Sequence, residues 1–347
     1  MYDYPELQQA KDDMLSQDSL YRPTVFWDNA AFLIERELIE QGIENFRRLP
    51  SSLVFYVPTY GTPGNSISVE QAAQITATMQ KSSPKTLQTL LQFLSGELSA
   101  RNDYRVLMAA DDSRALPALH KFSESKFGSP IEQFEFEGRR FSRSSLNYLL
   151  GLAMLKKHLG AEPVCTVLEV GGGFGTLGEI LASAGLKDWR YIDIDIPPTS
   201  FTAERYLSAA LGQEYVTGYM ATRDRSEIAI DSLSPVSVLC SWQIERLRGK
   251  VDLFVNFISF QEMEPSVVSN YLKHVERLGT RWVLLRNIRE GKQLRRGTNS
   301  VGVKIPIKSE DYLSFLPSFE LVDRNVYPFG FRTVDGYHSE LLLLRRR

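Results

Sequence analysis

The sequence predicts an α/β protein in which a mainly helical region precedes a parallel sheet that ends in an antiparallel hairpin. From Val164 onward, short apolar runs alternate with helical segments, which is the pattern of a parallel sheet covered on both faces. A glycine-rich turn follows the first of these runs. Prolines and glycines interrupt residues 328–336, so no long helix fits between the last two runs and a hairpin is expected. The expected strands are Cys165–Val170, Tyr191–Asp195, Val236–Trp242, Leu253–Ser259, Trp282–Asn287, Phe319–Tyr327 and Ser339–Leu344.

We divide the chain into residues 1–160, which are mainly helical, and residues 161–347, which contain the sheet. The first region is expected to cap a ligand site on the second region and is a candidate dimerisation surface for a homodimer. A helix is expected from Ser144 to Leu159, ended by Gly160, and a turn-rich loop after Val57. Two sets of apolar residues at helical spacing are expected to face the core: Phe32, Ile39, Ile43 and Phe46, and Leu87, Leu90, Leu91 and Leu94.

Composition limits the classes of partner. The chain has 347 residues, of which 43% are hydrophobic, so a sizeable core is expected. Its 40 basic and 42 acidic side chains give a net charge of -2, which disfavours nucleic acid and anionic lipid as partners. No stretch approaches the roughly 18 apolar residues of a membrane span, and we expect a cytoplasmic protein. Cys165 and Cys240 lie in apolar runs and are expected to be buried rather than paired or metal-bound.

The first expected strand runs into a turn made almost entirely of glycine. The segment Val167-Leu168-Glu169-Val170 is followed by Gly171-Gly172-Gly173-Phe174-Gly175 and then by a helical segment. Glycine lets the backbone turn sharply and lets a ligand approach closely. Glu169 can approach the cationic amino-acid end of a ligand, directly or through water, while the amides of the turn face the ligand's carboxylate. We therefore assign Glu169, Gly171, Gly173 and Gly175 to a cofactor site.

Two other interpretations of this turn are open. Gly173, Gly175 and Gly178 fit G-x-G-x-x-G, the dinucleotide fingerprint, which requires a strand that enters its first glycine. That strand would contain Gly171 and Gly172, which weaken a strand, so we disfavour this register. The turn could also be a plain strand-to-helix connection, but four glycines among five positions disfavour that.

A carboxylate is expected beside the ribose of a nucleoside ligand. The second expected strand ends about 20 residues after the turn, where an acid can accept hydrogen bonds from both ribose hydroxyls. We choose Asp195 because Ile196-Pro197-Pro198 ends the strand directly after it. Asp193 points to the same face and is the alternative.

The third expected strand ends at Ser241-Trp242-Gln243. Ligands of open α/β sheets bind outside the carboxyl ends of the strands, so these residues are candidates to frame an adenine. The alternative for Trp242 is an ordinary place in the core.

Several motifs spread over most of the chain are shared with a known family. They are Phe127-Gly128-Ser129-Pro130, the segment Phe141-Ser142-Arg143-Ser144-Ser145-Leu146-Asn147-Tyr148-Leu149, the glycine turn, Asp195-Ile196-Pro197, Tyr206-Leu207 and Asn256-Phe257-Ile258-Ser259-Phe260-Gln261-Glu262-Met263. Through them the sequence resembles a family of sugar O-methyltransferases found among bacterial surface-polysaccharide genes. Phe260 departs from the methionine expected there, and this apolar exchange leaves the predicted cofactor site unchanged.

The resemblance implies a Rossmann-like methyltransferase fold and S-adenosyl-L-methionine as cofactor. It also implies methyl transfer to a hydroxyl of a small-molecule or carbohydrate acceptor, namely a sugar, a glycosylated small molecule or a polysaccharide. The expected hairpin agrees, because nicotinamide-binding domains usually end with another parallel strand. Two other functions stay open: an NAD-dependent oxidoreductase that uses the shifted glycine register, and a non-catalytic binding module.

Transfer to a sugar hydroxyl requires a general base or a metal to remove the proton. Glu262, just beyond the fourth expected strand, is the first candidate for the base. Asn256 on the cofactor side and Gln261 on the acceptor side are candidate orienting groups. The alternative for Glu262 is a carboxylate at the N-terminus of a helix near Pro265. His338 is the second candidate, provided that its loop folds back to the site.

Arg143 and Tyr148 are candidates to bind the acceptor across a cleft between the two regions, although an arginine that begins a helix often has a structural role. Asp111-Asp112 is interpreted as a solvated turn. No further ligands stand at a recognisable spacing, so no metal site is assigned and a divalent metal requirement stays open.

Overall fold

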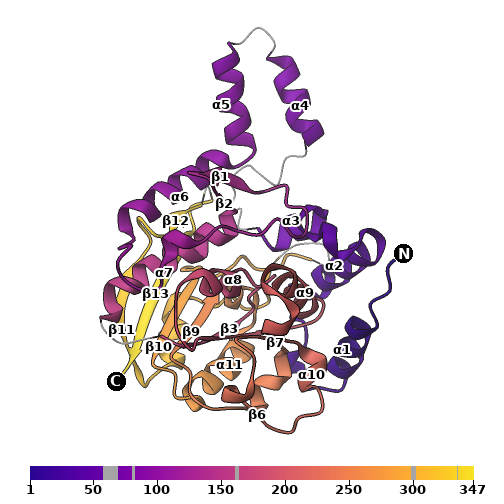
Figure 1. Ribbon diagram of the computed structural model, residues 1–347, viewed down its shortest axis with the longest axis vertical. Coiled ribbons are helices and arrows are strands. Elements are labelled where there is room, and N and C mark those ends of the chain that lie inside the picture. The colour runs from indigo at the N-terminus through magenta and orange to yellow at the C-terminus, as the bar shows by residue number, and fades with distance from the viewer. Residues whose placement is uncertain (58–68, 80–82, 161–163, 298–301, 334) are drawn as a thin grey trace.

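Strands from residue 166 onward form the centre of the molecule (Figure 1). The computed structural model describes all residues except 58–68, 80–82, 161–163, 298–301 and 334. Within the described residues, a nine-stranded sheet has the order β11-β13-β10-β9-β3-β4-β7-β5, and β12 pairs with β13. The strands are β3 (Thr166–Val170), β4 (Arg190–Asp195), β5 (Val216–Thr217), β7 (Val236–Cys240), β9 (Leu253–Phe257), β10 (Trp282–Ile288), β11 (Phe319–Asn325), β12 (Phe331–Arg332) and β13 (His338–Arg346).

The pairing confirms the predicted sheet. Strands β10, β9, β3, β4, β7 and β5 are parallel neighbours, and β13 is antiparallel to both β10 and β11. The sequence predicts this arrangement of parallel strands that ends in antiparallel ones. Glu169 of β3 lies opposite Asp193 of β4, so the carboxyl ends of these two strands lie side by side. The third predicted strand is shorter than expected, because Ser241 begins a 3-10 helix (Ser241–Arg246).

Alternating residues of the strands face two separate helical layers. Val167 packs in one apolar cluster with residues of α7, α8 and α9, and Leu168 packs in a second cluster with residues of α11, α12 and α1. A period of two along buried strands therefore supplies both cores. These helices are α1 (Pro5–Leu15), α7 (Arg143–Leu159), α8 (Thr176–Ser183), α9 (Thr199–Leu211), α11 (Pro265–Arg277) and α12 (Ser309–Phe315).

The predicted helix at 144–159 is confirmed as α7, which begins with a capping box between Ser142 and Ser145 and ends at Gly160. The division at residue 160 stays a prediction, because residues 161–163 lie outside the described part. The remaining helices and short strands are α2 (Trp27–Gln41), α3 (Pro50–Phe55), α4 (Val69–Thr78), α5 (Pro84–Leu94), α6 (Glu97–Ala110), α10 (Tyr219–Thr222), β1 (Phe134–Phe136), β2 (Arg139–Phe141), β6 (Ile228–Ala229) and β8 (Leu247–Arg248).

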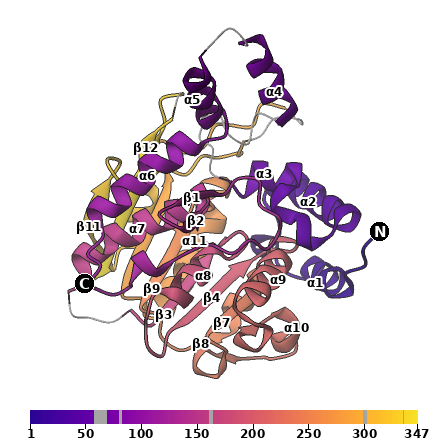
Figure 2. The same ribbon diagram turned by 45° about the horizontal axis from the view of Figure 1, so that its top comes forward.

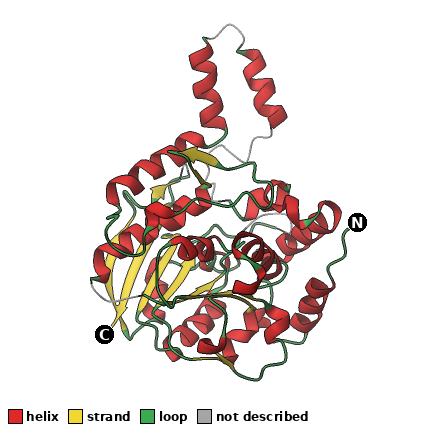
Figure 3. Ribbon diagram, viewed as in Figure 1, coloured by secondary structure: helices red, strands yellow, loops and turns green. Residues whose placement is uncertain are grey.

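The prediction that both helical faces lie in the core is wrong in part. Helices α4 and α5 project from the rest of the molecule, as Figures 2 and 3 show from two directions. On α5 Leu94 is buried, but Leu91 is 46% exposed, and Phe32 of α2 is 59% exposed. Helical spacing identifies an apolar face, but it does not say whether another element covers that face. The turn-rich loop expected after Val57 lies outside the described residues.

In the described parts of the chain, no helix combines the length and the apolar character needed to cross a membrane. Cys240 is buried and Cys165 half-buried, and both carry free thiols.

Candidate functional site

The glycine turn connects β3 to α8 in a backbone conformation that favours glycine. Gly171, Gly173 and Gly175 have φ of 74°, 64° and 90°. A Cβ atom at Gly171 would lie 2.0 Å from Oγ of Ser259. The close approach of the loop that follows β9 therefore adds a steric reason for glycine at this position.

Two amides of the turn are used inside the fold rather than for a ligand. The amide of Gly171 donates to the Ile194 carbonyl at 2.9 Å, and the amide of Gly172 donates to Oδ1 of Asp193 at 3.2 Å. The expectation that the first amides of the turn face a ligand carboxylate is thus corrected. Residues 171–174 of the turn all line the neighbouring cavity.

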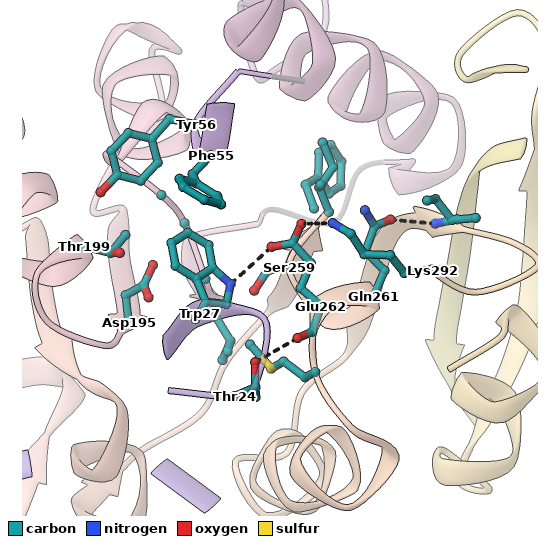
Figure 4. A pocket seen from close by; sticks show the side chains of 18 of the residues that line it. Thr24, Trp27, Phe55, Tyr56, Asp195, Thr199, Ser259, Gln261, Glu262 and Lys292 are labelled. Carbon is teal, nitrogen blue, oxygen red and sulfur yellow. Dashed lines mark hydrogen bonds and ion pairs between the residues drawn. The ribbon is translucent and has the colours of Figure 1, made fainter. Parts of the chain in front are cut away.

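A cavity of about 360 Å³ lies beside the turn. It extends from the turn and the end of β4, past the loop after β9, to the loop between β12 and β13. Residues of the helical N-terminal region form part of its wall, and Figure 4 shows Trp27 between Asp195 and Glu262. Polar residues that line the cavity include Arg22, Thr24, Asn147, Asp195, Thr199, Ser259, Gln261, Glu262, Lys292, Gln293, Thr333 and Asp335.

The two aspartates of β4 have different positions. Asp195 lines the cavity, whereas Asp193 is fully buried behind the turn and holds the Gly172 amide. Burial raises the pKa of Asp195 to about 8. The geometry therefore favours Asp195 over Asp193 as the acid that meets a ligand.

Glu169 does not reach the cavity directly. Its side chain is fully buried, and its two carboxylate oxygens accept hydrogen bonds from the hydroxyls of Tyr148, at 2.7 Å, and Tyr191, at 2.6 Å. Burial raises the pKa of Glu169 to about 7. Of the two contacts expected, direct or through water, the direct one is corrected, because Tyr148, which is bonded to Glu169 and stacks on Phe257, lines the cavity in its place.

Three residues predicted to bind the cofactor, Ser241, Trp242 and Asn256, do not line the cavity. Oγ of Ser241 donates to the Tyr21 carbonyl at 2.6 Å, because the N-terminal segment covers the end of β7. Trp242 is 3% exposed and packs edge-on against Tyr219, so the core alternative is correct. Asn256 donates to the Val170 carbonyl at 2.8 Å and accepts the Phe260 amide, which ties β9 to β3.

Glu262 lies in the cavity wall, 8% exposed, between two donors from distant parts of the chain. Lys292 Nζ lies 2.5 Å from its Oε1, and the indole nitrogen of Trp27 lies 3.1 Å from its Oε2. Burial raises the pKa of the Glu262 carboxyl despite the opposing effect of Lys292. Glu264 rather than Glu262 holds the cap position of α11, which disfavours the alternative of a helix N-terminal carboxylate.

Of the other candidates for the acceptor or the base, one lines the cavity and two do not. Gln261 lines the cavity, but its Oε1 accepts the Ile288 amide at 2.8 Å, so it also fixes the loop to β10. Arg143 is buried and pairs with Glu132 at 3.0 Å, which gives it the structural role named as its alternative. His338 pairs with Glu290 at 2.6 Å and does not line the cavity, so its loop does not fold back as required.

Metal ligands do not gather in the part of the chain that the structure describes, where no group of three or more His, Cys, Asp or Glu side chains could hold an ion. Asp111, one of the paired acids of the sequence, bonds to Lys156.

Sequence reasoning missed Trp27, Phe55, Thr199 and Lys292 as cavity residues. Trp27 and Glu262 are 235 positions apart, and no local pattern indicates that they meet. The helical spacing that includes Phe32 could have placed Trp27 at the start of a helix, but not in a site.

Replacing Gly171 with alanine is expected to lower the free energy of unfolding by at least about 2 kcal/mol, because the new methyl group overlaps Ser259 in addition to the strain of the left-handed backbone. Gly279→Ala is the matched control: Gly279 has a φ of 62°, and among the described residues no atom lies within 4 Å of the position that an added Cβ would take. Urea unfolding of both variants measures the difference. Equal losses would mean that the overlap with Ser259 is relieved without cost.

Comparison with known proteins gives likenesses of structure. No family model matches the chain, and no curated protein does. Among solved structures, a magnesium protoporphyrin IX methyltransferase (ChlM) from Synechocystis PCC 6803 with bound SAM has a TM-score of 0.39 and 16% identity over 59% of this chain and 81% of its own. The mitomycin 7-O-methyltransferase MmcR has a TM-score of 0.37 and 11% identity over 95% of this chain and 76% of its own. At such identities and TM-scores, these likenesses say nothing about what this chain binds.

Proposed function

We propose that the chain is an S-adenosylmethionine-dependent methyltransferase that acts on a hydroxyl of a sugar, a glycosylated small molecule or a polysaccharide. One observation carries the proposal: the glycine turn after β3 and the Asp195 carboxylate at the end of β4 open onto the same cavity, which also contains Glu262. The predicted homodimer and cytoplasmic location remain predictions.

The residues present fit the proposed cofactor. We assign the ribose hydroxyls to Asp195, which lines the cavity at the end of β4. We assign the amino-acid end to Gly173, Phe174 and Tyr148, whose hydroxyl is bonded to the buried Glu169 carboxylate. The cofactor's ammonium and sulfonium groups suit a cavity wall that contains the Asp195 and Glu262 carboxylates.

The dinucleotide alternative fits the fold less well. Strand β3 ends at Val170, so two residues separate it from Gly173, the first glycine of the shifted register. Strand β13 is antiparallel to β10, whereas nicotinamide-binding domains usually end with another parallel strand. Gly178 packs tightly on Tyr191: a Cβ atom added at Gly178 would lie 2.7 Å from the Tyr191 ring. This contact is compatible with either cofactor.

The chemistry follows from what the two ends of the cavity hold. S-adenosylmethionine would supply a methyl group bound to a sulfonium sulfur. When an acceptor oxygen takes this methyl group, the sulfur would become the thioether of S-adenosylhomocysteine. The Glu262 carboxylate accepts the acceptor's hydroxyl proton, and its raised pKa brings it closer to the working pH, where general bases are most effective. Lys292 and Trp27 fix the position of this carboxylate. Residues of the N-terminal region form part of the cavity wall, and a wall on this side would help to align the acceptor.

The lining of the acceptor end supports a sugar. Hydroxyl-bearing rings need several hydrogen-bonding partners together with an apolar surface. Thr333, Asp335 and Gln293 supply polar groups there, and Trp27 and Phe55 supply aromatic surface.

Affinity for S-adenosylhomocysteine is expected to rise by up to about tenfold for each pH unit between pH 6 and 8 and to level off above. The unliganded Asp195 has a pKa of about 8, and the ribose hydroxyls donate to its ionised form, so binding releases a proton below that pH. Titration calorimetry across this range measures the slope. Asp195→Asn should flatten it, and an equal slope in that variant would assign the proton to another group.

The proposed function is tested by incubating the full chain with S-adenosylmethionine and a panel of sugar hydroxyl acceptors and measuring S-adenosylhomocysteine formation. Acceptor-dependent turnover is expected. Binding of S-adenosylhomocysteine without turnover on any acceptor would support the non-catalytic module, and tighter binding of NADH would support the oxidoreductase.

A further inference from the structure

On the basis of the proposed function, we infer that Trp27 and Phe55 form a platform on which the acceptor's ring stacks, and that Trp27 thereby presents the ring's hydroxyl to Glu262. The platform belongs to the helical N-terminal region, while Glu262 belongs to the loop after β9. The acceptor class that fits is a ring with an apolar face and hydroxyls at its edge, as in a pyranoside.

The two rings are direct neighbours in the cavity wall. Trp27 is the first residue of α2 and Phe55 the last residue of α3, and their ring centroids lie 5.7 Å apart with planes inclined at 41°. Phe26 packs edge-on against both rings, and its ring centroid lies 5.9 Å from that of Trp27 and 6.0 Å from that of Phe55. Trp27 and Phe55 both line the cavity (Figure 4).

These rings are not ordinary core residues. Trp242 and Trp282 are 3% and 2% exposed, as expected for tryptophans that only fill space. Trp27 and Phe55 are only half-buried: they pack against the edge of the apolar core and also line the cavity. Aromatic surface left open inside a pocket next to a few polar groups is typical of a ligand site.

The platform is joined to the proposed base. The Trp27 indole donates to Oε2 of Glu262, and Lys292, which pairs with Oε1, lies 3.8 Å from the centroid of the Phe26 ring. The orientation of the indole is therefore fixed relative to the carboxylate. A ring stacked on the indole has its edge hydroxyl close to the group that would accept its proton.

The polar groups around the platform suit the remaining hydroxyls of such a ring. Thr333, Asp335 and Tyr337, from the loop between β12 and β13, line the same cavity. Asp195 and Thr199 line the opposite end, which we assign to the cofactor. The platform lies between these two ends, where the acceptor must meet the methyl group.

The test is saturation-transfer NMR on the full chain saturated with S-adenosylhomocysteine. The probes are the methyl pyranosides of glucose, galactose, mannose and rhamnose, with p-nitrophenol as a planar ring. The variants are Trp27→Ala and Trp27→Phe. Phe32→Ala is the matched control, because Phe32 lies on the same helix, is 59% exposed and does not line the cavity.

We expect ring protons of at least one pyranoside to be saturated in the wild type. Trp27→Ala should weaken that binding by about tenfold or more, whereas Trp27→Phe, which keeps an aromatic face, should weaken it by less than about threefold. Phe32→Ala should leave it unchanged. Affinity for S-adenosylhomocysteine should stay within about twofold in all three variants.

Three results would overturn the inference. Unchanged pyranoside binding in Trp27→Ala would show that the acceptor does not stack on Trp27. Loss of S-adenosylhomocysteine affinity in that variant would assign Trp27 to the cofactor site instead. Binding of p-nitrophenol but of no pyranoside would overturn the sugar as occupant while supporting the platform. A wild-type chain that does not bind S-adenosylhomocysteine would instead contradict the proposed function itself.

Discussion

Replacing Glu262 with glutamine is expected to lower kcat by about 10²- to 10⁴-fold, the usual contribution of a general base. Glutamine has nearly the same size and can still accept a hydrogen bond, but it cannot take the proton of a hydroxyl. Affinity for S-adenosylhomocysteine should stay within about twofold, because the cofactor end of the cavity is formed by the turn and Asp195. Initial rates and calorimetry measure the two effects separately.

The variant needs two controls. Glu320→Gln removes another carboxylate with a cationic partner, Arg345, on the half-exposed strand β11, and should leave kcat unchanged. His338→Gln should also have little effect, because His338 lies outside the cavity wall. An unfolded Glu262→Gln protein would mean that the carboxylate mainly holds Lys292 and Trp27 in place, and wild-type turnover by a folded variant would assign the proton to another acceptor.

Replacing Asp195 with alanine is expected to weaken cofactor binding by about 1–3 kcal/mol, or roughly 5- to 150-fold. The change removes the acceptor of two ribose hydroxyls and leaves them poorly paired in the cavity wall. Asp224→Ala is the control, since the Asp224 carboxylate is 91% exposed. Titration with S-adenosylhomocysteine measures both variants, and unchanged affinity in Asp195→Ala would redirect attention to Asp193.

The sheet could be predicted from the sequence because each of its strands carries its own signal. Apolar runs such as 166–170 and 253–257 are buried on both faces, and the breaks at 328–336 dictate the hairpin. The cofactor end of the site was predictable for a related reason. A glycine turn and a strand-terminal acid have fixed positions relative to their own strands, so Gly173 and Asp195 reach the cavity as expected.

The rest of the site, which includes several predicted cofactor residues as well as the acceptor side, could not be predicted in the same way, because distant segments meet there. Ser241 does not line the cavity, and its hydroxyl donates to the carbonyl of Tyr21, 220 positions earlier in the chain. Glu169 is enclosed by Tyr148, which the motif alone placed at the acceptor. Lys292 and Trp27 converge on Glu262 from loops and helices that no periodicity relates. Such contacts depend on how the N-terminal region packs against the sheet.

Calorimetric titration of the full chain with S-adenosylhomocysteine, and separately with NADH, tests the central claim most directly. We predict binding of one S-adenosylhomocysteine per chain and no detectable heat with NADH. No binding of S-adenosylhomocysteine by a folded protein would contradict it, because the glycine turn, Tyr148 and Asp195 would then surround a cavity built for another ligand.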